Sequence, residues 1–511
     1  MAGVFAIASI LMLCILVAPQ SDADASSGAM VDGTGYTSLQ DAVKNAEPGS
    51  TVVLTSDANI TSTLMITKKI VIDLNGHDIK ADGHSSNQIY VTESGDLTIK
   101  DSMDSNMDGS AGKIYGTHAY VYGTYDKTLI EVHGKFTMAS GFISYSLENA
   151  SDYGMFGIGV WGSGKVIING GKIETGWYAV AGNGADRAAN TEITVNGGYL
   201  ISTADYSVYN PQNGKVTING GTVYGAAGAI LMNRGILEIH GGLLTSKGIG
   251  STGDWGDGTG GASNAALHLN ARYDDVNATI DGGKLTAEGN AVLIDSGSKH
   301  TITLKISGGA FSEEPSAEYI ASGSIVTKIG DLYYVATEVQ PTSPGLVDTE
   351  QAEIVTNLGD ATDAVVKMPL VEVSLNGDSA IGNILVSATP RTFSEAPDAI
   401  ASYEITIVSG VSYTADITVA ADIARGFVPL VYYIDDDGNL VPVEVVSYTS
   451  TTVTFRTTHT TPFVVMTEAE PTVTPGYDDD EDDMPYVPPT VVSNSKNDST
   501  TTIVACAAAA V

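Results

Sequence analysis

A pair of glycines recurs six times in the middle of the chain, each time after a short run of alternating apolar residues. The pairs are Gly170-Gly171, Gly197-Gly198, Gly220-Gly221, Gly241-Gly242, Gly282-Gly283 and Gly308-Gly309. The residues before them read VIIN, ITVN, VTIN, LEIH, ATID and LKIS. Alternation with a period of two indicates a β-strand, and a glycine pair indicates a turn. Each copy therefore predicts a strand that ends in a tight corner.

A second apolar segment follows each of the first five glycine pairs. These segments end at Val180, Val208, Ile230, Leu267 and Val292, and only the fourth is delayed, by an insertion of about 16 residues in a repeat of roughly two dozen. Such a short repeat with two strands cannot bury its apolar face alone, but it can do so by stacking on its neighbours. A β-propeller blade needs about 40 to 50 residues, which is too long. The sequence therefore predicts an all-β, single-stranded parallel β-helix.

Stacking of the repeats predicts which residues form vertical ladders. One inward ladder should consist of Ile168, Val195, Ile218, Ile239, Ile280 and Ile306. Asn169, Asn196 and Asn219 should stack at the corner, where side-chain amides can bond along the stacking axis.

The first predicted coil is preceded by a segment that fits an end cap. In YTSLQDAVKNAEPGSTVVL, residues 36–54, Leu39, Ala42, Val43 and Ala46 share one helical face. This stretch resembles the start of the pectin-lyase-like β-helix superfamily, and ITKKIVIDLNGHDI (66–79) is similar to its first coil. Residues 306–335 are similar to the closing coil of adhesin-like members on prokaryotic cell surfaces. Over residues 30–340 the resemblance implies a right-handed β-helix and, for many members, polysaccharide lyase or glycosidase activity.

The rest of the chain divides by composition. We expect a signal peptide at 1–25, or alternatively a transmembrane or buried helix, followed by the β-helix at 30–340. A linker at 341–366 should lead to an antiparallel β-sandwich at 367–467. An acidic Pro/Thr-rich disordered spacer is expected at 468–500, and the truncated start of an apolar anchor, or alternatively a short apolar end, at 501–511. This layout predicts an extracellular, cell-surface protein that touches the membrane only through a terminal anchor.

Charge limits the partners. The chain carries a formal net charge of −36, so nucleic acid and polyuronates are disfavoured unless cations bridge them. Neutral glycans feel no such repulsion. The excess of 24 Tyr over 9 Phe suits rings that meet both water and a ligand, although Tyr-rich exposed strands would give the same count. Glycans or other cell-surface components are the expected partners.

Two segments are candidate sites. In the inserted loop, Asp254, Trp255 and Asp257 combine an aromatic face with carboxylates that could accept sugar hydroxyls, unless Trp255 packs back on the coil. Asp104, Asn106 and Asp108 match the opening of a calcium loop, but Tyr115 stands where a bidentate acid is needed, which favours an ordinary turn. No cofactor is expected, with Ca²⁺ as the one possibility. Glycosylation sequons lie at Asn59, Asn149, Asn277 and Asn497.

No catalytic residues are predicted. Lys172, Arg187, Arg234 and Arg272 stand at different offsets from their glycine pairs, so nothing in the repeat gathers them. Asp274 and Asp275 would point to opposite faces of a strand, Asp186, Asp205 and Asp295 are scattered turn residues, and His240 is a corner residue. The leading hypothesis is therefore a non-catalytic, adhesin-like surface protein that binds glycans or another surface. A polysaccharide lyase or glycoside hydrolase and a purely structural stalk remain the alternatives.

Overall fold

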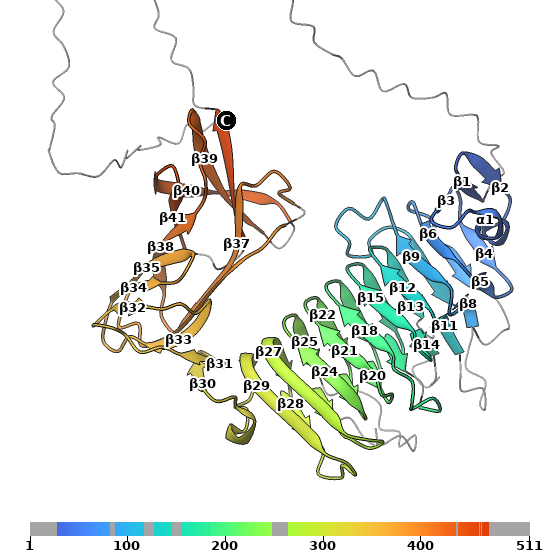
Figure 1. The fold of residues 1–511 in the computed structure, drawn as a ribbon, viewed down its shortest axis with the longest axis horizontal. Coiled ribbons are helices and arrows are strands. Elements are labelled where there is room, and N and C mark those ends of the chain that lie inside the picture. The colour runs from blue at the N-terminus through green and yellow to red at the C-terminus, as the bar shows by residue number, and fades with distance from the viewer. Residues whose placement is uncertain are drawn as a thin grey trace, which may run out of the picture.

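The computed structural model describes residues 28–81, 87–116, 127–145, 155–182, 184–247, 264–393, 395–435, 438–458, 460 and 462–469. The protein is all-β, with 56% strand and 3% helix. Long parallel stacks of short strands occupy the first part of the chain, and antiparallel strands occupy the last part (Figure 1). None of the helices in the described ranges has the length and apolar character needed to cross a bilayer.

The glycine-pair strands and their counterparts form the first parallel stack. Its strands are β3 (Thr51–Leu54), β6 (Lys69–Asp73), β9 (Asp96–Lys100), β12 (Lys135–Met138), β15 (Lys165–Ile168), β18 (Glu192–Val195), β21 (Lys215–Ile218), β24 (Gly235–Ile239), β27 (Val276–Ala287) and β29 (Ile302–Phe311). The predicted inward ladder is confirmed, because Ile168, Val195, Ile218, Ile239, Ile280 and Ile306 pair in register and are at most 1% exposed.

The strands after the corner form a second parallel stack. They are β4 (Ala58–Ile60), β7 (Ile79–Ala81), β10 (Lys113–Gly116), β13 (Phe142–Tyr145), β16 (Lys172–Thr175), β19 (Tyr199–Ser202), β22 (Thr222–Gly225) and β25 (Leu243–Ser246), followed by the second half of β27. The corner needs both glycines. The second adopts φ from 79° at Gly171 to 101° at Gly309, and a Cβ on Gly197 would lie 2.6 Å from the Asn169 carbonyl oxygen.

The predicted asparagine ladder is present at this corner. The Asn196 side-chain amide donates to Asn169 Oδ1 and that of Asn219 donates to Asn196 Oδ1, each over 2.7 Å. These bonds run along the stacking direction, so they tie consecutive repeats together where the backbone turns away from the sheet.

The second apolar segments form a third parallel stack, which is a separate sheet of nine strands. They are β5 (Leu64–Ile66), β8 (Asn87–Val91), β11 (Lys127–Val132), β14 (Met155–Val160), β17 (Val180–Gly182), β20 (Tyr206–Asn210), β23 (Gly228–Met232), β26 (Ala265–Leu269) and β28 (Val292–Ile294). Val180, Val208, Ile230, Leu267 and Val292 align in register as their offsets predicted. All three stacks contribute to one continuous apolar cluster, the main core.

The N-terminal end of the main core is covered by the predicted cap. Strands β1 (Ala29–Val31) and β2 (Thr34–Tyr36) lead into α1 (Leu39–Asn45), whose N-cap Ser38 accepts the Asp41 N–H at 3.1 Å. Leu39, Ala42, Val43 and the adjoining Ala46 are at most 3% exposed, so the predicted apolar face of this helix is buried.

Beyond β29 most strand pairs are antiparallel, with two parallel pairs among them. After η1 (Ala317–Tyr319) the strands are β30 (Ser324–Ile329), β31 (Leu332–Glu338), β32 (Leu346–Asp348), β33 (Glu353–Asn357), β34 (Asp363–Lys367), β35 (Val371–Gly377), β36 (Asn383–Pro390), β37 (Ala401–Ser409), β38 (Tyr413–Ala420), β39 (Phe427–Ile434), β40 (Leu440–Tyr448), β41 (Thr452–Thr457) and β42 (Pro462–Ala469). Short strands thus occupy part of the segment predicted as a linker. Strands β33–β42 enclose an apolar cluster distinct from the main core.

Candidate functional site

The inserted loop that carries Asp254, Trp255 and Asp257 lies outside the described residues, as do the sequons at Asn149 and Asn497. Asn59 in β4 and Asn277 in β27 are both exposed on their strands. The expected signal peptide and the apolar tail also lie outside the described ranges.

The calcium-like segment forms a turn organised by one buried carboxylate. Asp104, 3% exposed, accepts the backbone N–H groups of Asp108, Gly109 and Gly141 over 2.8 to 3.2 Å. Asp108 in turn accepts the Ser110 N–H at 2.9 Å. These carboxylate oxygens therefore face amide donors, which is the arrangement of a capped turn.

The face of the third stack turned away from the main core carries side chains of an unusual kind for the outside of a sheet. It carries a second apolar cluster of Tyr178, Ala181, Tyr206, Tyr209, Ala227 and Leu231, against which Phe156 and Trp177 pack. Every residue of β20, β23 and β26 is buried, so both faces of these strands are shielded from water. We call this surface the outer face of the third stack.

Aromatic rings follow one another along this outer face. Phe156 lies 5.4 Å from Trp177, Trp177 stacks on Tyr178 at 4.8 Å, and Tyr178 stacks on Tyr209 at 4.9 Å between ring centroids. The Trp177 indole N–H donates to the Asp205 carboxylate. Rings on successive repeats thus form a file parallel to the stacking direction, with a carboxylate beside it.

The N-terminal part of the third stack carries a second run of rings, which are partly exposed. His133 stacks between Tyr90 and Trp161, with centroid distances of 4.9 and 6.0 Å. The Glu131 carboxylate lies 2.6 Å from His133 Nε2 and is only 9% exposed. Burial and the nearby Glu131 charge raise the pKa of the Tyr90 hydroxyl, so this phenol stays neutral and able to donate a hydrogen bond.

The C-terminal end of the outer face holds a buried histidine. His268 pairs with Leu231 and Leu293 in register, its side chain is 6% exposed, and its Nδ1 lies 2.8 Å from the Tyr206 hydroxyl. Its Nε2 lies 3.4 Å from Asp295 Oδ2 without hydrogen-bond geometry and has no other hydrogen-bond partner. Burial lowers the pKa of the imidazole and outweighs the opposing effect of Asp295, so His268 is neutral at pH 7.

Backbone strain flanks the strand that carries His268. Asn264, just before β26, has φ of 54°, and Ala271, just after it, has φ of 46°. The left-handed region costs an alanine on the order of 1 kcal/mol, and such residues persist only where the surroundings hold them. Strained residues of this kind cluster at functional sites, so their position on both sides of β26 makes this strand a candidate for a functional role.

The turns that leave the third stack bring charged residues together. Arg234 donates to the Arg187 carbonyl oxygen at 2.9 Å and to Asp274 Oδ2 at 2.6 Å, and the Arg187 guanidinium lies 3.8 Å from the centre of the Tyr273 ring. Arg272 lies over the same ring at 5.8 Å. The expectation that nothing gathers these arginines was wrong, because parallel stacking superposes turns of unequal length that the glycine-pair offsets do not align.

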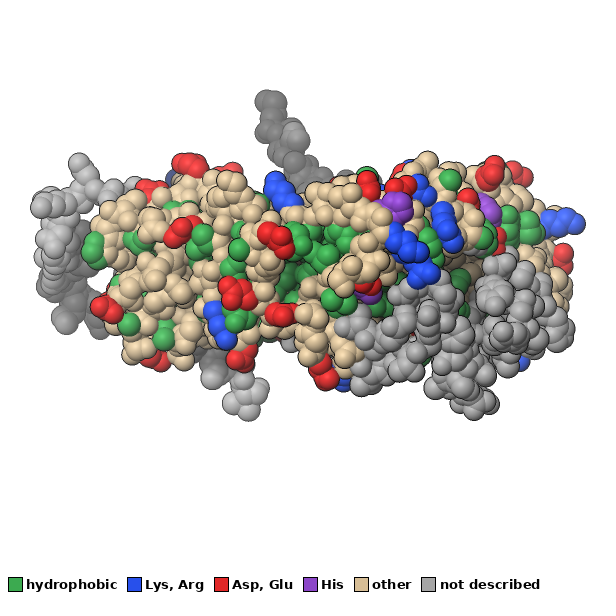
Figure 2. All heavy atoms as spheres, turned by 90° about the horizontal axis from the view of Figure 1, so that it is seen from below, with side chains coloured by type: hydrophobic (Ala, Val, Ile, Leu, Met, Phe, Trp, Pro, Cys, Tyr) green, Lys and Arg blue, Asp and Glu red, His purple; other side chains and the backbone are tan. Residues whose placement is uncertain are grey.

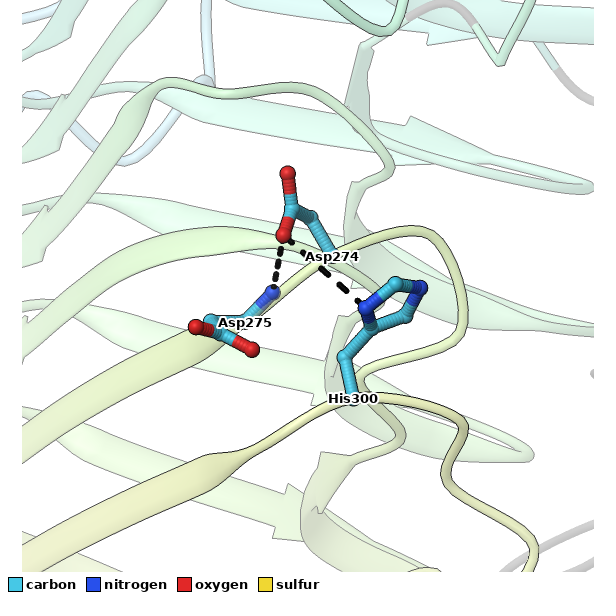
Figure 3. Close-up of side chains that lie close together, drawn as sticks. All are labelled: Asp274, Asp275 and His300. Atoms are coloured by element: carbon cyan, nitrogen blue, oxygen red, sulfur yellow. Dashed lines mark hydrogen bonds and ion pairs between the residues drawn. The ribbon is translucent and has the colours of Figure 1, made fainter.

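Asp274 and Asp275 also lie differently from the prediction. They stand in the turn before β27 and not within a strand, and ligand atoms of Asp274, Asp275 and His300 lie within 4.8 Å of one another (Figure 3). The Asp275 N–H, then Arg234 and His300, lower the pKa of the Asp274 carboxyl, which opposes a role as general acid. The Thr301 N–H donates to Asp275 Oδ1 at 2.9 Å.

These three side chains are the set in the described residues that could hold a metal ion. However, the Arg234 guanidinium, the Asp275 N–H and the Thr301 N–H already engage three of the four carboxylate oxygens. Donors of this kind compete with a cation for the same lone pairs, so the arrangement is that of an ion-paired turn.

Three aspartates that were predicted to be scattered turn residues all contact residues in or next to the third stack. Asp186 accepts the Gly162 N–H at 3.2 Å, Asp205 accepts Trp177, and Asp295 lies beside His268. His240 lies on the corner after β24, as predicted, and its Nδ1 is 2.7 Å from Asp281 Oδ1. A sequence signal for the outer face did exist, since aromatic residues flank the second apolar segment in GWYAVAG (176–182) and DYSVYN (205–210).

No family model matches this chain, and no curated protein or solved structure matches it either.

Proposed function

We propose that this chain is a secreted or surface-anchored, adhesin-like protein that binds glycans without cleaving them. In this proposal the parallel stacks form a right-handed β-helix of the pectin-lyase-like kind, and the antiparallel strands form a separate β-sandwich. The glycine-pair corners, the inward ladder and the α1 cap support the β-helix. The separate apolar cluster of β33–β42 supports the sandwich.

The aromatic file on the outer face of the third stack carries the proposal. An extended glycan presents alternating apolar ring faces and hydroxyl groups, and it is recognised by aromatic side chains with nearby carboxylates. Tyr90, His133 and Trp161 are partly exposed along one line, and the Glu131 carboxylate adjoins them. The file runs along the stacking direction, so a linear polymer could contact several repeats at once.

Charge indicates the ligand class. With a net charge of −36, the protein repels polyuronates, whereas neutral and amino sugar polymers are not repelled. Figure 2 shows acidic side chains spread over one face of the described residues, with several basic side chains gathered over one part of it. The lowered pKa of Asp274 and its ion pair with Arg234 support binding without hydrolysis at the neighbouring turn.

A glycan array followed by affinity electrophoresis tests the proposal. The wild-type protein should be retained by at least one neutral or N-acetylamino sugar polymer, and Trp161→Ala should lose that retention with an unchanged circular dichroism spectrum. Tyr199→Ala is the matched control, because Tyr199 is an exposed ring on the second stack, 45% accessible. Retention that survives Trp161→Ala, or release of reducing sugar from the polymer, would overturn the proposal.

A further inference from the structure

At the C-terminal end of the outer face, the His268 imidazole and the Asp295 carboxylate lie side by side without a hydrogen bond between them. His268 Nε2 is buried without a hydrogen-bond partner, and Asp295 Oδ2 lies 3.4 Å from it on a side chain that is 32% exposed. A buried polar atom without a partner costs about 1 to 3 kcal/mol, so its retention calls for an explanation. An absent ligand group is such an explanation.

Either the Tyr206 hydroxyl or His268 Nδ1 can donate in their contact, and the Asp295 carboxylate beside Nε2 favours the tautomer that carries the proton on Nε2. In this tautomer the Tyr206 hydroxyl donates to Nδ1 over 2.8 Å, and Nε2 becomes a donor. Tyr206 therefore acts as a positioning residue, because its hydroxyl contacts the nitrogen opposite the one that faces Asp295.

We propose that His268 and Asp295 form a subsite that holds one hydroxyl group of a neutral sugar at the end of the aromatic file. The hydroxyl oxygen accepts the Nε2 N–H and its hydrogen is donated to Asp295 Oδ2. An oxygen can lie about 2.8 Å from both atoms, since they are 3.4 Å apart. A hydroxyl supplies both an acceptor and a donor, which a carboxylate or a methyl group does not.

The subsite also explains selection by charge. Asp295 would repel a ligand carboxylate, and His268 is neutral and offers no compensating positive charge. The inference rests on the proposed glycan binding and narrows it to polymers whose sugar at this position is uncharged and carries a free hydroxyl. The strained residues Asn264 and Ala271, which bracket β26, would then hold His268 in place for that contact.

Isothermal titration with three probes tests the subsite: cellohexaose, chitohexaose and a polygalacturonate hexamer. The full chain should bind at least one of the first two and not the third. Asp295→Ala should weaken that binding at least tenfold with an unfolding midpoint within a few degrees of the wild type. His268→Phe keeps a ring of similar shape but removes both nitrogens, and it should weaken binding as much.

The matched control is His300→Ala, because His300 is an exposed histidine on the next turn. It should bind as the wild type does. Tyr206→Phe should weaken binding less than His268→Phe and should shift its pH dependence, which a role confined to packing would not do. If Asp295→Ala and His268→Phe bind within twofold of the wild type while Trp161→Ala does not bind, the subsite is wrong and the glycan-binding proposal stands. If the wild type binds no neutral probe, both proposals fall.

Discussion

The outer faces of the first and third stacks differ although the same repeats build them. On the first stack outward residues reach solvent and form cross-strand ion pairs, such as Lys165–Glu192 at 2.8 Å and Lys215–Glu238 at 2.7 Å. On the third stack the outward residues of β20, β23 and β26 are uncharged and buried, and His268 Nε2 lacks a hydrogen-bond partner.

This contrast separates structural surface from candidate binding surface. Exposed ion pairs contribute about 0 to 1 kcal/mol each and need no ligand. The third stack already buries one face against the main core, and burying its other face removes further polar groups from water. This lowers stability where those groups lack hydrogen bonds, so their presence suggests a functional reason. Functional experiments should therefore address the third stack, and four measurements test whether the two faces differ in this way.

The largest effect is expected from the inward face that both stacks share. Val195→Asp places a carboxylate at a position that is 0% exposed between Ile168 and Ile218, and it should lower the free energy of unfolding by several kcal/mol. Thr194→Asp, one residue earlier and facing outward, should cost under about 1 kcal/mol. Urea unfolding of both variants checks the register, and equal losses would contradict it.

Two tyrosines compare the outer faces directly. Tyr209 is 5% exposed and stacks on Tyr178, whereas Tyr199 on the second stack is 45% exposed. Tyr209→Ala should destabilise the protein by about 3 kcal/mol, as is typical for removing a buried aromatic ring, and Tyr199→Ala by about 0.5 kcal/mol or less. Differential scanning calorimetry measures both. Similar small shifts would mean that the aromatic file is not a packed face.

Two histidines should respond to pH with opposite sign. The pKa of His268 is lowered by burial, so its contribution is present above the unfolded pKa near 6.5 and is lost as pH falls below it. At His240 burial acts to lower the pKa, but Asp281 and Glu238 together raise it, so its contribution is present below about 6.5 and is lost as pH rises through the folded pKa.

Thermal midpoints from pH 5 to pH 8 check this difference. Relative to the wild type, His268→Gln should gain on the acid side, and His240→Gln should lose there by a smaller amount, because the His240 side chain is 38% exposed and solvent screens its ion pairs. Parallel profiles for the wild type and His268→Gln would show that His268 does not titrate with folding.

The smallest effect should come from the ion pairs of the first stack. Lys165 and Glu192 have side chains that are 51% and 52% exposed. Lys165→Met should change the free energy of unfolding by about 0.5 kcal/mol or less, and the change should vanish at about 1 M salt, where the screening length is about 3 Å. A loss of several kcal/mol would place this face among the structural determinants and remove the contrast.

Sequence reasoning reached the repeat because that information is local. The glycine pairs, the inward ladder from Ile168 to Ile306 and the alignment of Val180 with Val208 depend on short periodic patterns, and each was confirmed in register. The candidate site was not predicted from the sequence, because Tyr206, His268 and Asp295 come from three different repeats whose turns differ in length.

Short repeated strands, an apolar side on each strand and a corner at each glycine pair can all be predicted from the amino-acid order. These properties follow from alternation within a few residues and from the conformational freedom of glycine. That the outward sides of β20, β23 and β26 are also buried became clear only from the folded arrangement. Period-two alternation identifies which residues share a face, but whether a face meets water depends on which segments stack against it, and that is a property of contacts between repeats. The same stacking brought the Tyr206 hydroxyl, the His268 imidazole and the Asp295 carboxylate within hydrogen-bonding range.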